Sequence, residues 1–270
     1  MAPLTPALSQ RERDGDGRMT RNTMIRREHP TQKGEMIPVA QMDYAAAHAL
    51  QWQLHAERVA ALRPDTLVVL EHDPVMTLGR TTQPAHWTRQ QLTLTQQGIP
   101  VIKCERGGSV TFHGPGQVVG YPILLLRNFC SGPKAYVHML EEVVIRVLAQ
   151  WNIDGLRLPH LPGVWVNDSR LNGKIPAKIA AVGVHVARGV TLHGFALNVT
   201  VNLEPFGLVQ PCGLAHGYVT SMAAVLGICQ VSTVREQIAR CFGEVFGVVW
   251  ESHATLRQEG ISPGFLRAQE

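Results

Sequence analysis

The amino-acid sequence predicts an α/β (α+β) domain built on a mixed sheet. From Ile37 onward, segments with apolar residues at helical spacing alternate with short apolar runs typical of strands. The chain has 270 residues, of which 45% are hydrophobic and 17% charged, so it can bury a substantial core as one domain with appendages. No run approaches the roughly 18 consecutive apolar residues of a membrane span, so no membrane association is expected.

The first elements after residue 36 are a helix and two strands. Asp43 is predicted to cap an alanine-rich helix that runs to Leu62 and is stopped by Pro64. The next run, TLVVL at 66–70, has the composition of a buried strand. A short strand at 75–78 should pair nearby.

A glycine-rich hairpin is predicted next, in the segment RGGSVTFHGPGQVVGYP at 106–122. Residues 109–112 alternate as a short strand, 113–117 have turn composition, and a second strand follows at 118–126. The four glycines remove side chains where the backbone would closely approach another group. These residues alone leave open both an ordinary turn between strands and a ligand pocket.

The remaining elements continue the alternation. Apolar residues at helical spacing predict a helix over 134–151 that packs across the sheet. Two strands, 178–186 and 190–199, are joined by an Arg-Gly turn and form a second hairpin. A Thr-x-x-Glu capping box at 233–236 is predicted to open a final helix that ends near Phe246.

The two ends of the chain are expected to lie outside the domain. Residues 1–35 mix Pro, Gly, Arg and Gln with almost no apolar periodicity, which indicates a disordered extension or a mis-assigned start. The domain is placed at 36–250. Residues 251–270 carry no recognisable motif and are assigned to a C-terminal tail.

Charge and cysteine content limit the possible partners and compartments. Residues 1–35 hold seven of the 25 basic and five of the 21 acidic residues, which leaves 18 against 16, or +2, for the rest. This excess is too small to predict nucleic-acid binding, although it is compatible with an acidic protein partner. Five cysteines, an odd number without close pairs, argue against a disulfide framework and a zinc cluster and favour the reducing cytoplasm.

The glycine-rich segment also resembles a family signature. R-G-G-x-x-T-aromatic-H-G-P-G-Q-x-x-x-Y is similar to the signature of the lipoyl(octanoyl) transferases. Further blocks follow the family's order: EHDPV at 71–75 with TLG at 77–79, PGVWV at 162–166, AKIAAVG at 177–183, HGFALNV at 193–199 and PCG at 211–213. The resemblance covers roughly residues 36–226. It implies the fold of the biotin and lipoate protein ligase catalytic domains, with a small C-terminal subdomain.

The resemblance implies an octanoyltransferase domain at 36–250. Such enzymes move an octanoyl group from acyl carrier protein to a lysine of a lipoyl domain, as the first step of endogenous protein lipoylation. The acceptors implied are lipoyl domains of 2-oxoacid dehydrogenase E2 subunits and the glycine cleavage H protein. The donor thioester is already activated, so ATP and other cofactors are not expected.

A cysteine suits this chemistry, because exchange between a thiol and a thioester is nearly isoenergetic and a thiolate is strongly nucleophilic. Cys212 is the candidate, since Pro211 and Gly213 flank it in an irregular stretch that could present the sulfur. The other cysteines lie in strand, turn or apolar helical contexts and are expected to be inert fillers: Cys104, Cys130, Cys229 and Cys241.

The resemblance assigns to Lys178 the role of activating the cysteine. Either an ion pair with the thiolate or a neutral lysine that takes the thiol proton would serve. Lys174, in the preceding turn, is the alternative, and a lysine at a strand edge is often simply exposed. Two departures from the family pattern, Pro176 and Gln210, put partner contacts in doubt more than activity.

By resemblance, three segments line the acyl channel and bind substrate: Arg106, Gly107, Gly108, Ser109, Val110, Thr111, Phe112 and His113, then Ala181, Val182 and Gly183, and finally Gly194, Phe195 and Ala196. His113 and His193 could orient donors or the oxyanion, or serve as structural hydrogen bonders. No metal-ligand spacing is evident, so no metal is expected.

Other functions remain open at this stage. An ATP-dependent lipoate or biotin ligase shares the implied fold, but no phosphate-binding loop stands out in the sequence. A non-catalytic module that binds the carrier protein or lipoyl domains would have no need of both Cys212 and Lys178. A cysteine hydrolase lacks the Cys-Gly-Ser-Cys-Trp type of signature here.

Overall fold

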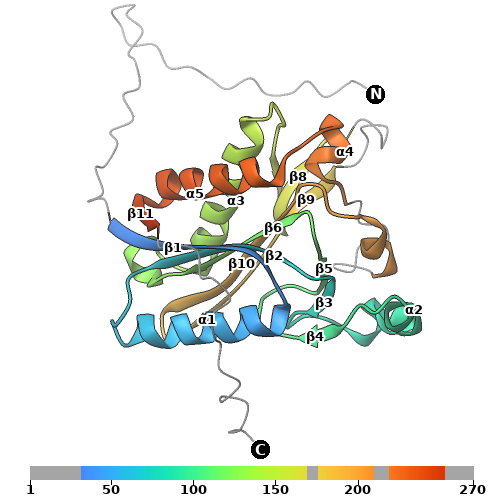
Figure 1. The fold of residues 1–270 in the computed structure, drawn as a ribbon, viewed down its shortest axis with the longest axis horizontal. Helices are drawn as coiled ribbons and strands as arrows, with labels where there is room; N and C mark the ends of the chain where they lie inside the picture. The colour runs from blue at the N-terminus through green and yellow to red at the C-terminus, as the bar shows by residue number, and fades with distance from the viewer. Residues whose placement is uncertain (1–31, 169–175, 210–218, 253–270) are drawn as a thin grey trace, which may run out of the picture. The chain divides into compact units, whose positions relative to one another are not determined.

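A computed structural model describes residues 32–168, 176–209 and 219–252, all of which belong to one compact unit. Its centre is an eight-stranded mixed sheet (Figure 1). In spatial order the strands are β11 (Val248–Ser252), β1 (Gln32–Met42), β2 (Thr66–His72), β6 (Gln117–Ile123), β10 (Val190–Asn198), β9 (Ala177–Ala187), β8 (Leu161–Val166) and β7 (Leu156–Leu158). The first three strands are parallel to one another, and every later neighbour is antiparallel.

A second sheet has three strands in the order β4 (Val101–Lys103), β3 (Val75–Leu78) and β5 (Val110–His113). The predicted pairing of residues 109–112 with residues 118–126 is wrong, because β5 pairs with β3 whereas β6 lies between β2 and β10 of the large sheet. The glycine-rich turn therefore carries the chain from one sheet to the other.

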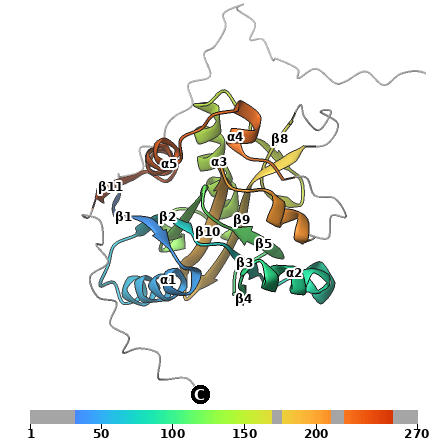
Figure 2. The ribbon, with the colours of Figure 1, turned by 45° about the vertical axis from the view of Figure 1, so that its right-hand side comes forward.

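Helices cover both faces of the large sheet, as Figures 1 and 2 show. On one face α3 (Pro133–Ala149) and α5 (Val231–Phe246) pack against each other, and α1 (Tyr44–Val59) lies on the opposite face. The described ranges also contain two short helices, α2 (Gln91–Gln96) near the small sheet and α4 (Met222–Leu226) before α5. Short 3-10 turns occupy Pro84–His86, Thr88–Gln90, Leu126–Asn128 and Glu204–Leu208.

The central strands are buried on both faces and divide their side chains between two cores. In β2, Leu67 and Val69 join the core under α3 and α5, whereas Val68 and Leu70 join the core under α1. This alternation is the two-residue period of a strand. A third cluster, which includes Phe112, holds the small sheet in place.

Several predicted elements are confirmed. The Asp43 carboxylate accepts a hydrogen bond from Ala46 N at 2.9 Å and caps α1, although the helix ends at Val59, three residues before Leu62. The strand at 75–78 has the predicted bounds. The second hairpin, β9 and β10, and the helix that packs across the sheet, α3, are also present.

The C-terminal helix begins differently from the prediction. α5 starts at Val231 with Gln230 as its N-cap and no side-chain cap, so the predicted capping box at 233–236 is wrong. Buried apolar residues, among them Val234 and Ile238, hold the helix from its first turn. Packing therefore decides where this helix begins.

The limits of the domain are wider than 36–250. Gln32 pairs with Val248 and Glu35 with Glu251, so residues 32–35 and 251–252 belong to the large sheet. The described C-terminal elements α5 and β11 add to this sheet and its helical layer. Among the described residues, no helix combines the length and hydropathy needed to cross a bilayer.

Candidate active site

A cavity of about 220 Å³ lies between the glycine-rich loop, β6, β9 and β10. Every residue predicted to bind the acyl chain lines this cavity except Phe112. The ring of Phe112 instead lies in the core of the small sheet, edge-on to Phe206 at 5.5 Å between centroids. Lys178 and His193, both singled out in the sequence, also line the cavity, as do four residues that were not: Tyr44, Gln117, Val119 and Tyr121.

Two glycines allow the cavity walls to approach one another. A Cβ on Gly194 would lie 2.1 Å from the carbonyl oxygen of Gly120, and one on Gly183 would lie 2.9 Å from that of Gly107. The glycine-rich loop docks on β9 at this point, where Gly107 N donates to the carbonyl of Val184 at 2.9 Å. Any side chain at position 194 would push β10 away from β6.

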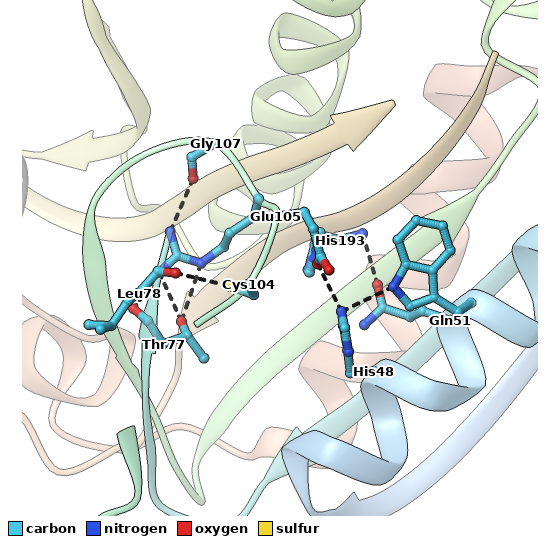
Figure 3. A network of polar contacts seen from close by, with 10 residues as sticks. His48, Gln51, Thr77, Leu78, Cys104, Glu105, Gly107 and His193 are labelled. Carbon is cyan, nitrogen blue, oxygen red and sulfur yellow. Dashed lines mark hydrogen bonds and ion pairs between the residues drawn. The ribbon is translucent and has the colours of Figure 1, made fainter. Parts of the chain in front are cut away.

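The family signature forms a hydrogen-bonded line inside the protein. The Arg106 guanidinium donates to Thr77 Oγ1 at 3.2 and 2.8 Å, and to the carbonyl of Gly107 at 3.0 Å (Figure 3). Since Thr77 Oγ1 accepts from Arg106, its own proton is directed to His113 Nε2 at 3.3 Å. His113 Nδ1 then donates to Gln117 Oε1 at 2.7 Å. Burial lowers the pKa of His113 well below its usual range, so the ring is neutral in this line.

The line continues to the strand that bears Lys178. Gln117 Nε2 donates to Asn198 Oδ1 at 2.9 Å, and Asn198 Nδ2 donates to the carbonyl of Thr220 at 3.0 Å. Thr220 N donates to the carbonyl of Lys178 at 3.0 Å, and Thr220 Oγ1 donates to the buried Asp168 at 2.8 Å. Each of these hydrogen bonds is donated in the same direction, from Arg106 towards Asp168. We call this series of hydrogen bonds the one-way line.

Lys178 lies at one end of the cavity and is half-buried. Its Nζ donates to the carbonyl of Pro162 at 3.0 Å and lies 4.8 Å from the centroid of the Trp165 ring, within the range of a cation–π contact. Val219 forms a parallel bridge with Lys178 and also lines the cavity.

The proposed nucleophile, Cys212, lies outside the described residues, as do Lys174 and Gln210. The described chain stops at Val209, buried in the core of the small sheet, and resumes at Val219 beside Lys178. Of these two flanks, Val219 lines the cavity, whereas Val209 packs in the core of the small sheet. Pro176 is half-buried directly before β9.

The four described cysteines are free thiols away from this end of the cavity. Burial raises the pKa of Cys229 and of Cys241, which keeps both thiols protonated. Cys104 Sγ lies 3.5 Å from the carbonyl oxygen of Leu78. These environments agree with the structural role expected for them.

A polar cluster at the other end of the cavity consists of His48, Glu105 and His193, and we call it the His193 cluster (Figure 3). His193 has a left-handed backbone, with φ of 57°, inside strand β10, and its N–H donates to Gln51 Oε1 at 2.8 Å. Burial, together with His48 and Arg106, lowers the pKa of His193 to about 3, so its imidazole is neutral at neutral pH. The sequence analysis singled out neither His48 nor Glu105.

His193 lies far from Lys178. It pairs with Val184, six residues along β9 from Lys178, which corresponds to about 20 Å at the usual rise of a strand. The hypothesis that His193 orients groups at the reacting centre is therefore not supported by its place in the sheet.

Comparison with known proteins identifies similar chains. The family described as lipoyl protein ligase A/B catalytic domain matches residues 43–243. The octanoyltransferase of Koribacter versatilis is 44% identical over 222 residues, which are 80% of this chain and 86% of the relative. The octanoyltransferase of Chloroflexus aurantiacus (strain J-10-fl) is 44% identical over 212 residues, 78% of this chain and 92% of the relative.

Solved structures share the fold at low sequence identity. A lipoate-protein ligase A bound with ATP gives a TM-score of 0.63 at 14% identity, with 84% of this chain and 90% of that chain covered. A bi-partite lipoate protein ligase from Thermoplasma acidophilum gives 0.62 at 14% identity, with 84% and 88% covered. These likenesses bear out the predicted fold class.

Proposed function

Because the chain belongs to the lipoyl protein ligase A/B catalytic domain family and is an acyltransferase related to octanoyltransferases, we propose that it moves an octanoyl group from acyl carrier protein to a lysine of a lipoyl domain. The observation that carries the proposal is the cavity. It is lined by the segments of the family signature, and it ends at Lys178 beside the flank of the Cys212 segment. The acceptors proposed are the E2 lipoyl domains and the glycine cleavage H protein.

In the proposed mechanism the acyl group passes through the enzyme in two steps. The Cys212 thiolate attacks the carbonyl carbon of the donor thioester, a new C–S bond forms, and the carrier thiolate leaves. The amine of the acceptor lysine then attacks this second thioester, an amide bond forms, and the Cys212 thiolate leaves. Lys178 accepts a proton from the attacking amine.

The cavity suits the apolar part of the acyl group. Val119, Val182 and Ala196 contribute apolar wall, and each methylene group transferred from water to such a wall is worth about 0.8 kcal/mol. Binding of the chain therefore holds the thioester carbon at the Lys178 end. The chemistry requires no cofactor, because the donor is already activated.

The nearest alternative is an ATP-dependent ligase of the same fold. The fold cannot separate the two, since a lipoate-protein ligase with bound ATP shares it. Identity of 44% to octanoyltransferases, against 14% to that ligase, favours the transferase. The free thiols of the four described cysteines agree with the reducing cytoplasm as the proposed compartment.

The test is the intact mass of the protein after incubation with octanoyl-acyl carrier protein. We expect a gain of one octanoyl group that is discharged by a lipoyl domain, and no gain in Cys212→Ala. Cys229→Ala, which removes a thiol of raised pKa, is the matched control and should still be acylated. Octanoylation that requires ATP and free octanoate would assign the chain to the ligases, and binding without transfer would assign it to the non-catalytic modules.

A further inference from the structure

The His193 cluster brings three metal-ligating side chains together from three separate elements. His48 lies on α1, Glu105 lies in the loop before β5, and His193 lies on β10. Glu105 Oε2 is 2.9 Å from His48 Nε2 and 3.5 Å from His193 Nε2, and the three ligating atoms all lie within 4.8 Å of one another (Figure 3).

Two ring nitrogens and one carboxylate oxygen converge in this cluster. Glu105 Oε2 is a carboxylate oxygen and presents lone pairs to both histidines. Trp52 Nε1 lies 3.2 Å from His48 Nε2, and the single lone pair of that nitrogen can go either to the indole N–H or to a cation. A cation among the three atoms would take one lone pair from each.

We propose that His48, Glu105 and His193 bind a divalent transition-metal ion of the zinc class. Ligands about 2.0–2.1 Å from a tetrahedral zinc ion lie about 3.4 Å from one another, and the observed 2.9 and 3.5 Å bracket this value. Two imidazoles and one carboxylate form a donor set that suits zinc or cobalt better than magnesium or calcium, which prefer oxygen ligands.

The exposure of the three side chains leaves one side of the site open. His193 is 3% exposed, whereas His48 is 26% and Glu105 41% exposed. Solvent reaches the site from the side of His48 and Glu105, so water can supply the fourth ligand. Entry of the ion requires no opening of the core.

The ligands are held by contacts outside the cluster. Gln51 from α1 fixes the backbone of His193, and a left-handed histidine costs on the order of 1–3 kcal/mol that the surrounding structure must offset. Two hydrogen bonds hold the loop that carries Glu105. Arg106 donates to Thr77 Oγ1, and Gly107 N donates to the carbonyl of Val184 on β9. The positive charge of Arg106 opposes a metal ion, but its guanidinium donates to the carbonyl oxygens of Thr77 and Gly107.

The metal site goes beyond the proposed function and does not depend on it. His193 lies about 20 Å along the sheet from Lys178, so the ion would not contact the proposed reacting centre. It would join α1, the signature loop and β10 at the His193 end of the cavity. A bound ion should therefore raise the thermal stability of the chain.

Cobalt titration of the full chain, freed of metal with a chelator, tests the site. We expect one Co²⁺ per chain, visible d–d absorption of a tetrahedral ion, no thiolate-to-cobalt charge-transfer band, and loss of the signal when Zn²⁺ is added. Glu105→Gln and His48→Ala should each weaken binding at least about tenfold. Both side chains are half-exposed, and near-ultraviolet circular dichroism without metal checks that each variant is folded.

His138→Ala is the matched control. His138 Nδ1 lies 3.1 Å from Glu141 Oε2 in another His–Glu contact. Among the described residues, no third ligating side chain lies close enough to this pair to complete a metal site. This variant should bind cobalt as the unsubstituted chain does. The proposal is overturned by absence of binding, by a thiolate charge-transfer band, or by equal affinity in the cluster variants. None of these results involves an acyl substrate, so the proposed transferase function would stand.

Discussion

The two ends of the cavity differ in how deeply their charged and polar groups are buried. At one end, Lys178 is half-buried, and among the described contacts its amine meets a backbone carbonyl and a tryptophan ring. At the other end, His193 and Tyr121 are buried and contact each other's rings, and Tyr121 is hydrogen-bonded to His72. The comparison shows a half-buried lysine, which we propose to be reactive, at one end and buried, mutually packed rings at the other.

The largest effect is expected at the Lys178 end. Lys178→Met should lower kcat/KM by about 10²–10⁴-fold, because the amine that assists the proton transfers is lost. Lys178→Arg keeps the charge but cannot accept a proton, so rescue by arginine would indicate an ion pair. Lys174→Met is the control and should remain close to the unsubstituted enzyme. If Lys174→Met lowered kcat/KM more than Lys178→Met, the roles proposed for the two lysines would be exchanged.

The close backbone contact at Gly194 should matter for stability more than for chemistry. Gly194→Ala places a Cβ 2.1 Å from a carbonyl oxygen and is expected to lower the free energy of unfolding by about 3 kcal/mol, measured by urea denaturation. Gly107→Ala is the matched change, since its Cβ would lie 3.4 Å from the nearest atom, an ordinary contact. Equal losses in the free energy of unfolding for the two variants would contradict the tight backbone contact inferred at Gly194.

The burial of His72 should also make stability depend on pH. Burial lowers the pKa of His72 to about 4, and in this state His72 accepts a hydrogen bond from Tyr121 at 2.6 Å. The unfolded chain binds a proton near pH 6.5, so the contribution of His72 is complete above that pH and is lost as pH falls towards 4. The loss should reach about 3 kcal/mol. In His72→Gln the decline between pH 6.5 and 4 should be shallower, and an unchanged decline would contradict the assignment.

The smallest effect is expected between the two ends. Ala181→Leu adds bulk to the cavity wall and should reduce octanoyl transfer about tenfold, with a smaller reduction for a shorter acyl donor. Ala180→Gly, at the neighbouring position, whose side chain joins the core under α3, should change stability without changing the preference for acyl length. The ratio of kcat/KM for the two donors is the measurement.

Local patterns in the sequence predicted local structure well. The Asp43 cap and the turn between β9 and β10 each depend on residues close together in the chain. The pairing of strands could not be predicted in this way. Period-two alternation indicates that a strand is present, but it does not identify the strand that lies beside it in the sheet. β5 and β6 therefore resembled a hairpin although they belong to different sheets.

The polar sites were harder to predict for the same reason. His48 and Glu105 are 57 residues apart, and only the packing of α1 against β10 brings them together with His193. One weak local signal was present, a histidine and a tryptophan one helical turn apart at positions 48 and 52. The capping box at 233–236 shows the opposite case, a local pattern that buried contacts along α5 override.

The one-way line from Arg106 to Asp168 also limits how this sequence can drift. Each member accepts from one neighbour and donates to the next, so Gln117→Glu would replace a donor by an acceptor and leave Asn198 Oδ1 facing another oxygen. Repair would require a second substitution that restores a donor at that junction. We therefore expect Gln117 and Asn198, 81 residues apart in the sequence, to tolerate such a change only when both are substituted together.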